Sequence, residues 1–215
     1  MNKFKAIIFD IDGTLTNEIS WTAFTRDIGG SVAEHLAIYG EHVNGNIGYD
    51  ESKEKLLKLW QETGKAKKAH IEPLFHTWPI KKEAQSTIDW LKDNEYLVCL
   101  ITGSVGIYAR YVAERLGVSD YYANAELHFD NEGDLVDFDY TTDQAAVKLK
   151  QLNDYCSRYD LKLEECVPVG DSSNDIQLFQ QTGNGVLVLD KNTAVELKEA
   201  AWKTIDSLEE LRSLL

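Results

Sequence analysis

The stretch Phe9-Asp10-Ile11-Asp12-Gly13-Thr14-Leu15-Thr16, which follows the apolar run Lys5-Ala6-Ile7-Ile8, decides the fold of this chain. A short and continuous apolar run predicts a strand of a parallel sheet that is buried on both faces. Two acids, Asp10 and Asp12, stand at its carboxyl end, and side chains two residues apart point to the same side of a strand. Ligands of open α/β sheets bind outside these carboxyl ends. Because buried carboxylates are costly unless a cation or a reaction uses them, we predict a functional site here.

Two other interpretations of this stretch are a plain Asp-Gly turn after a strand and a calcium-binding loop. Gly13 suits a sharp turn in either case, and it also lets the backbone approach a ligand closely. The calcium loop fails on spacing, because its twelfth position needs a glutamate and the twelfth residue from Asp10 is Trp21. The paired acids therefore favour chemistry over a turn alone.

The composition restricts the partners of the protein. The 215 residues include 36 acids against 22 lysines and arginines, a formal charge of −14. Such a surface repels nucleic acid and anionic membranes, so we expect neither as a partner. A phosphorylated substrate would be repelled as well unless a metal ion and a placed lysine supply local positive charge. No feature of the sequence indicates an oligomeric state.

The cysteines and the apolar segments predict a cytoplasmic protein. Cys99, Cys156 and Cys166 form no metal-binding spacing, and an odd, scattered set suggests reduced thiols. The first apolar run is too short for a signal peptide and ends in Asp10. No segment approaches the length of a membrane span.

Residues 17–78 read as helices with no strand between them. Ser20 and Asp50 are expected to cap two of these helices, and Gly40 is expected to end another. A fourth helix is predicted from residue 65 to about residue 75. We predict a helical module inserted after the first strand. Its aromatic side chains are expected to form mainly its own core: Trp21, Phe24, Tyr39, Tyr49, Trp60, Phe75 and Trp78.

From Pro79 onward, strands and helices alternate. Strands are predicted at residues 96–101, 165–169, 185–189 and 203–205, and a β-hairpin turns at residues 130–133. Helices are predicted at residues 81–94, 105–116, 176–181 and 194–201, and a long one begins at Thr142 or Asp143. Alternation of this kind indicates an α/β fold with a doubly wound parallel sheet.

Three more elements stand at matching places in this alternation. Thr102-Gly103 follows the second strand, Lys148 lies in the helix before the third, and Gly170-Asp171-x-x-Asn174-Asp175 follows the third. With the stretch at residues 9–16, they make the chain resemble the haloacid dehalogenase superfamily of magnesium-dependent phosphotransferases. The closest similarity is to its phosphoserine phosphatase branch. The resemblance implies a Rossmann-like core at 1–16 and 79–215 and a helical cap at 17–78.

The resemblance implies an Mg²⁺-dependent phosphatase that acts on a small phosphorylated metabolite. Asp10 would be the nucleophile that forms an aspartyl phosphate. Asp12 would be general acid and then base, and it would bind the metal through its backbone carbonyl. Asp10 and Asp171 would hold the metal through their carboxylates, which suit Mg²⁺. The dehalogenases of the superfamily lack the second acid, so Asp12 favours phosphoester hydrolysis.

The remaining motif residues would bind the phosphoryl group or support the metal site. The Thr102 hydroxyl and the Gly103 amide would hold phosphoryl oxygens, and Lys148 would neutralise charge that develops on them. Asn174 and Asp175 would support the metal site, Asp175 through water or by orienting Lys148. Lys150 is a rival lysine, but it faces another side of the helix.

The cap departs from the phosphoserine phosphatase pattern at one position. Glu54 stands where that branch places the arginine that binds the serine carboxylate, and Lys53 and Lys55 are expected to point elsewhere. Glu18 is expected to meet a substrate amine or hydroxyl. Phosphoserine is therefore predicted to be a poor substrate. The alternatives are a phosphoserine phosphatase proper, a phosphotransferase or mutase of the superfamily, and a non-catalytic domain that binds phosphorylated partners.

Overall fold

The structure is a computed structural model that describes residues 3–191 and 193–215. Its centre is a seven-stranded sheet in the order β4-β3-β2-β1-β5-β6-β7. All neighbouring strands are parallel except β3 and β4, which form an antiparallel hairpin. The strands are β1 (Ala6–Phe9), β2 (Leu97–Val105), β3 (Asp120–Phe129), β4 (Leu135–Tyr140), β5 (Cys166–Gly170), β6 (Val186–Val188) and β7 (Lys203–Ile205).

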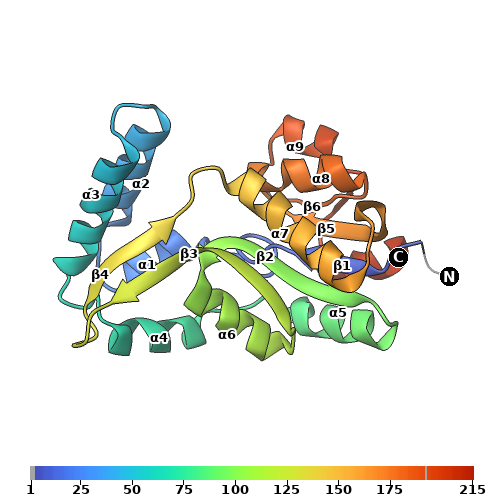
Figure 1. Cartoon of the computed structure of the whole chain (residues 1–215), viewed down its shortest axis with the longest axis horizontal. Helices are drawn as coiled ribbons and strands as arrows, with labels where there is room; N and C mark the ends of the chain where they lie inside the picture. Colours follow the sequence, from blue (N-terminus) through green and yellow to red (C-terminus); the bar gives the residue numbers. More distant parts are fainter. Residues whose placement is uncertain (1–2, 192) are drawn as a thin grey trace.

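Helices cover both faces of this sheet, as Figure 1 shows, with α7 to α9 on one side and α5 and α6 on the other. The doubly wound α/β fold is thus confirmed. These helices are α5 (Lys82–Asp93), α6 (Gly106–Leu116), α7 (Gln144–Tyr159), α8 (Ile176–Thr182), α9 (Val195–Ala200) and α10 (Leu211–Leu214). No helix in the described part of the chain is both long and apolar enough to cross a bilayer.

The alternation of side chains along β1 explains why this strand occupies the centre. Ile7 and Phe9 pack into the core on the face of α5 and α6, whereas Ala6 and Ile8 pack with residues of α7 such as Tyr155. All four β1 side chains are almost fully buried. A strand that is apolar on both faces can therefore only lie between two helical layers.

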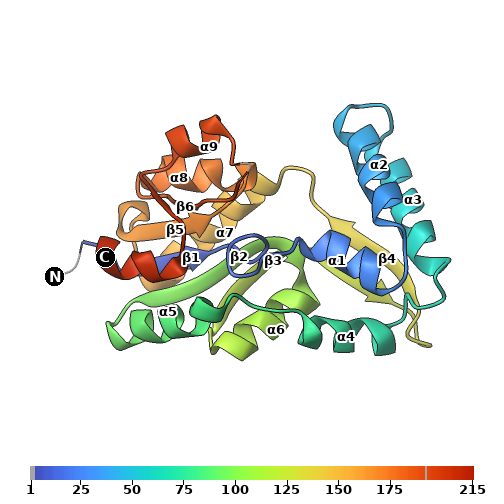
Figure 2. The same cartoon turned by 180° about the vertical axis from the view of Figure 1, so that it is seen from behind.

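Between β1 and α5 the chain forms four helices: α1 (Ser20–Asp27), α2 (Val32–Val43), α3 (Tyr49–Gln61) and α4 (Lys68–Thr77). Figure 2 shows α2 and α3 as a pair that stands at the end of the molecule opposite the C-terminus. Trp60 of α3 is fully buried and lies 5.0 Å from the rings of both Phe24 and Phe138. The helical segment is thus anchored on β4 as well as on its own helices.

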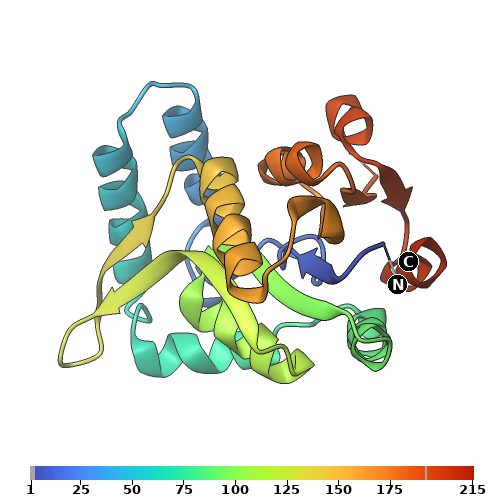
Figure 3. The same cartoon turned by 45° about the vertical axis from the view of Figure 1, so that its right-hand side comes forward.

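The hairpin of β3 and β4 reaches beneath α3, which is visible in Figure 3. Several polar contacts join it to the helical segment. Lys67 pairs with Asp134 at 2.6 Å, Lys53 pairs with Asp137 at 2.8 Å, and the Gln61 amide donates to the Leu135 carbonyl at 2.9 Å. The helices and the hairpin therefore pack against each other.

Several predicted helix ends were wrong. Ile19, not Ser20, precedes the first helix, because the Ser20 side chain bonds to Asp12 instead of capping. Gly48 takes the place predicted for Asp50, and Gly40 lies inside α2 rather than at its end. The predicted cap at Asp143 was correct, since its carboxylate accepts the Ala146 N–H at 3.1 Å.

Candidate active site

The carboxyl ends of β1, β2 and β5 meet at one edge of the sheet. Phe9 is in register with Leu100 of β2 and Val169 of β5, so the residues after these positions come together. Asp10 continues this alignment, because its N–H donates to the Val169 carbonyl at 3.0 Å. The paired acids predicted from the sequence therefore lie at the centre of the edge.

Asp10 is held by two donors on opposite oxygens. Its Oδ1 accepts the Ile11 N–H at 2.6 Å, and its Oδ2 accepts Lys148 Nζ at 2.8 Å. Burial raises the pKa of Asp10, although the Lys148 ammonium opposes this shift. The carboxylate is thus fixed in direction before any ligand arrives, and it faces the cavity described below.

Lys148 is fully buried and joins two carboxylates. Besides Asp10, it donates to Asp175 Oδ1 at 2.7 Å. Burial alone would lower the pKa of this lysine, but the charges of Asp10 and Asp175 raise it above its usual value. Lys148 therefore remains an ammonium ion at neutral pH. Lys150, the rival lysine, is exposed.

Asp171 and Asp175 complete a group of carboxylates around Asp10. One oxygen from each of Asp10, Asp171 and Asp175 lies within 4.8 Å of the others. Asp175 is already occupied, because its Oδ2 accepts the N–H groups of Asp171 and Ser172 and its Oδ1 accepts Lys148. Burial, followed by the charges of Asp10 and Asp175, raises the pKa of Asp171 to about 7.

Gly13 is required by this geometry. Its φ is +75°, and a Cβ there would lie 2.0 Å from Asp171 Oδ2. Thr14 follows and donates its hydroxyl to Asp171 Oδ1 at 3.0 Å. The turn after β1 thus positions the acid that follows β5.

Asp12 faces the helical segment rather than Lys148. Its Oδ2 accepts the Ser20 N–H at 3.0 Å and the Ser20 hydroxyl at 2.5 Å, and Ser20 Oγ lies 2.6 Å from Ser104 Oγ. Its Oδ1 is buried and has no partner in the described part of the chain. Burial raises the pKa of Asp12 to about 7. This carboxyl can therefore exchange a proton near neutral pH.

A cavity of about 270 Å³ lies over these acids. Asp10, Asp12, Asp171, Gly103 and Asn174 line it, as sequence reasoning led us to expect. Its other walls come from the helical segment, from β4 and from the start of α7. The acids at the strand ends thus open into a cavity that a small molecule can enter.

A model of haloacid dehalogenase-like hydrolases matches residues 4–183 of this chain. The chain belongs to the haloacid dehalogenase-like hydrolase family. The resemblance stated from the motifs alone is thereby confirmed, and the matched range includes every motif residue discussed above.

Relatives within this hydrolase family are similar over most of the chain. A phosphoserine phosphatase of Methanocaldococcus jannaschii is 28% identical over 188 residues, which cover 84% of this chain and 83% of that protein. One of Archaeoglobus fulgidus is 24% identical, over 85% of this chain and 52% of that protein. The structure of a substrate-bound phosphoserine phosphatase complex aligns with a TM-score of 0.76 at 25% identity, covering 99% of both chains.

Thr102 lies beside the site of this hydrolase without lining its cavity. It is fully buried, and its hydroxyl oxygen accepts the Ser104 N–H at 3.2 Å. Gly103 does line the cavity, and its carbonyl accepts the Trp21 indole N–H at 3.2 Å. The second strand end thus connects the acids to the helical segment.

Glu54 and Glu18 lie outside the cavity, which corrects their expected placement. Glu54 is exposed on α3, and Glu18 is exposed and pairs with Arg26 at 2.9 Å. Lys53, expected to point elsewhere, lines the cavity instead. The reason is helical rotation, because Ser52, Leu59 and Trp60 turn inward on α3 and carry Lys53 toward the cavity.

Sequence reasoning missed Ser20, Ser104 and Gln144. Gln144 lines the cavity and accepts the Asn124 amide at 2.6 Å. Three aromatic residues expected in the cap core also line the cavity: Trp21, Tyr39 and Tyr49. Ser104 offered one signal, since it follows Thr102 by two residues at a strand end. The others depend on contacts between segments distant in the sequence.

Proposed function

We propose that this hydrolase is an Mg²⁺-dependent phosphatase that cleaves a small phosphomonoester through an aspartyl-phosphate intermediate. The observation that carries the proposal is Asp10, a buried carboxylate aimed into a cavity, held by Lys148 at 2.8 Å and flanked by Asp171. The names of its relatives, both phosphoserine phosphatases, support the reaction class. We also propose that residues 1–16 and 79–215 form the catalytic core and residues 17–78 its cap.

The residues present fit a magnesium ion. Carboxylate oxygens are the ligands that this ion prefers, and the oxygens of Asp10 and Asp171 lie within 4.8 Å of each other. We infer that these two carboxylates and the Asp12 carbonyl would hold it. Asp175, whose oxygens are occupied by Lys148 and by N–H groups, would act as a support. The ion would offset the repulsion between Asp10 and a phosphate dianion.

In the first chemical step, an Asp10 oxygen forms a bond to phosphorus as the bond from phosphorus to the ester oxygen breaks. Asp12, which lines the cavity, gives its proton to the departing alkoxide, for which its pKa of about 7 is suited. In the second step, Asp12 takes a proton from water. The water oxygen then attacks phosphorus, and the Asp10 carboxylate is released with inorganic phosphate.

Lys148, Gly103, Thr102 and Asn174 would act on the phosphoryl group. The Lys148 ammonium lies close enough to Asp10 to neutralise charge on the oxygens transferred to it. Gly103 and Asn174 both line the same cavity. Thr102 is buried beside Ser104, so its hydroxyl would need to turn toward the ligand.

The test compares wild-type protein with Asp10→Asn, using p-nitrophenyl phosphate and excess Mg²⁺. We expect phosphate release by wild type and a loss of at least about 10³-fold in Asp10→Asn, as for removal of a nucleophile. Circular dichroism establishes that the variant is folded. Turnover by folded Asp10→Asn at the wild-type rate would exclude the covalent mechanism. Transfer of the phosphoryl group to an added alcohol in preference to water would indicate a phosphotransferase.

A further inference from the structure

The wall of the cavity opposite the acids is aromatic and apolar. Five aromatic rings line it, from α1, α2, α3 and β4, together with three aliphatic side chains: Trp21, Tyr39, Tyr49, Phe138, Tyr140, Ile19, Leu36 and Leu56. Trp21 meets Tyr140 edge to face at 5.6 Å and Phe138 at 5.8 Å. Such a wall favours a flat apolar ligand over a short polar one.

Part of this wall is open to solvent. Ile19, Leu36 and Tyr39 are 47%, 53% and 49% exposed, although all three border the cavity. Exposed apolar side chains that converge on one cavity mark a binding surface more strongly than scattered ones. The apolar wall therefore continues from the acids to the cavity mouth, with space for a group larger than a serine side chain.

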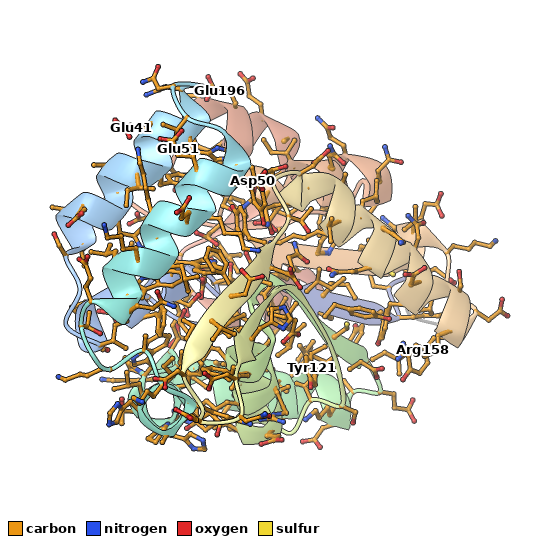
Figure 4. All side chains as sticks on the ribbon, turned by 60° about the vertical axis from the view of Figure 1, so that its left-hand side comes forward. Glu41, Asp50, Glu51, Tyr121, Arg158 and Glu196 are labelled. Carbon is orange, nitrogen blue, oxygen red and sulfur yellow. The ribbon has the colours of Figure 1, made fainter. Side chains whose placement is uncertain are left out.

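The wall offers no free cation to a substrate carboxylate. Lys53 is the one lysine or arginine among the described lining residues. Its ammonium pairs with Asp137 at 2.8 Å and lies 5.6 Å from the Phe138 ring. Glu41, Asp50 and Glu51 surround the outer ends of α2 and α3 (Figure 4), so the nearby surface is acidic as well. A carboxylate would lose its hydration without gaining a partner.

One polar atom in the wall is unsatisfied. His42 lines the cavity, and its Nδ1 is buried with no hydrogen-bond partner in the described residues. The Nδ1 of His35, by contrast, lies 2.7 Å from the Thr25 hydroxyl. A buried imidazole nitrogen left unpaired is costly. Because this nitrogen is closed off from the cavity, it offers a ligand no polar contact, and the wall meets a ligand through its apolar surface.

We propose that the preferred substrate is the phosphate ester of a primary alcohol that carries an aromatic ring. The phosphate lies at Asp10, and the ring packs against Trp21, Tyr39, Phe138 and their neighbours. This inference rests on the proposed phosphatase function and specifies its substrate.

The experiment compares esters with similar primary alkoxide leaving groups, so that intrinsic reactivity does not decide the result. The substrates are ethyl phosphate, 2-phenylethyl phosphate and O-phospho-L-serine. Burying a phenyl ring predicts a kcat/KM about 10- to 100-fold higher for 2-phenylethyl than for ethyl phosphate.

Two matched variants on α2 test whether the wall is responsible. Leu36 lines the cavity and Val43 does not, yet both are exposed on the same helix, at 53% and 61%. Leu36→Asp should reduce the ratio of 2-phenylethyl to ethyl phosphate kcat/KM about tenfold. Val43→Asp carries the same added charge and should leave that ratio unchanged.

The possible failures are distinguishable. If ethyl phosphate or phosphoserine is turned over as well as the aromatic ester, the phosphatase function stands and the aromatic substrate class is overturned. If phosphoserine has the highest kcat/KM and Lys53→Met removes that difference, then Lys53 leaves Asp137 and binds the carboxylate of phosphoserine. If no ester is hydrolysed, the proposed function fails. Calorimetric binding of 2-phenylethyl phosphate to Asp10→Asn with Mg²⁺ then still decides whether the cavity prefers an aromatic group.

Discussion

Replacing Lys148 by methionine tests how much the buried ammonium stabilises the carboxylates of Asp10 and Asp175. Methionine keeps most of the volume of the aliphatic stem and removes the ammonium that joins Asp10 and Asp175 at 2.8 and 2.7 Å. Lys148 is 0% exposed, and the two carboxylates are 7% and 2% exposed. The variant therefore leaves two buried acids with no cation between them.

The expected loss of stability follows from this burial. Removing one partner from a buried ion pair costs about 3–5 kcal/mol, because the remaining charge stays buried without compensation. Protonation limits the cost, since burial already raises the pKa of Asp10 and loss of the ammonium raises it further. An acid whose pKa is raised in the folded state destabilises it at high pH. The deficit should thus be largest near pH 8 and shrink toward pH 5.

Urea denaturation in EDTA, at several pH values, measures this deficit. Lys150→Met is the control, because Lys150 is exposed on the same helix and surface substitutions usually change stability by less than about 0.5 kcal/mol. Phosphatase activity should fall about 10²- to 10³-fold in Lys148→Met and stay near wild type in Lys150→Met. Equal unfolding free energies for the two variants at pH 8 would refute the reasoning.

Three further predictions concern the metal, the turn after β1 and the cap. Chelation with EDTA should abolish activity and added Mg²⁺ should restore it; full activity after exhaustive chelation would contradict the metal role of Asp10 and Asp171. Gly13→Ala should cost about 1–2 kcal/mol for its left-handed backbone and more than tenfold in kcat, because its Cβ would meet Asp171 Oδ2 at 2.0 Å; urea denaturation and initial rates measure the two effects. Burial lowers the pKa of His35 to about 4. Between about pH 4 and pH 6.5 the unfolded state therefore binds more protons than the folded state, and the free energy of unfolding falls as the pH is lowered through this range. From about pH 7.5 to pH 5, wild type should lose about 2 kcal/mol of unfolding free energy relative to His35→Asn. Parallel losses in urea denaturation would show that the pKa of His35 is the same in the folded and unfolded states.

The sequence predicted the sheet and the acids well because both depend on local pattern. Apolar runs such as Ala6–Phe9 and Cys166–Gly170 fit only a strand with two covered faces, and both are buried as expected. The carboxyl ends of parallel strands must then meet at one edge. Asp10 and Asp171, separated by most of the chain, could therefore be placed together before any coordinates.

The helical segment at residues 17–78 was predicted less well because its details depend on which face of each helix turns inward. Lys53 and Glu54 are adjacent, and a rotation of about 100° per residue sends one into the cavity and the other into solvent. Ser20 has the composition of a helix cap, yet its hydroxyl bonds to Asp12, a contact fixed by tertiary packing. Local propensity cannot encode such a preference.

The contacts between the hairpin and the helical segment determine which parts of the chain can be exchanged between related proteins. Trp60 and Trp21 pack on Phe138, and Lys53 and Gln61 bond to the strand that carries it. A graft of residues 17–78 alone onto a related core would therefore separate these rings from their partner. We expect a chimera to retain its selectivity only when residues 120–140 travel with the helices, which makes two distant stretches of the chain a single unit of exchange.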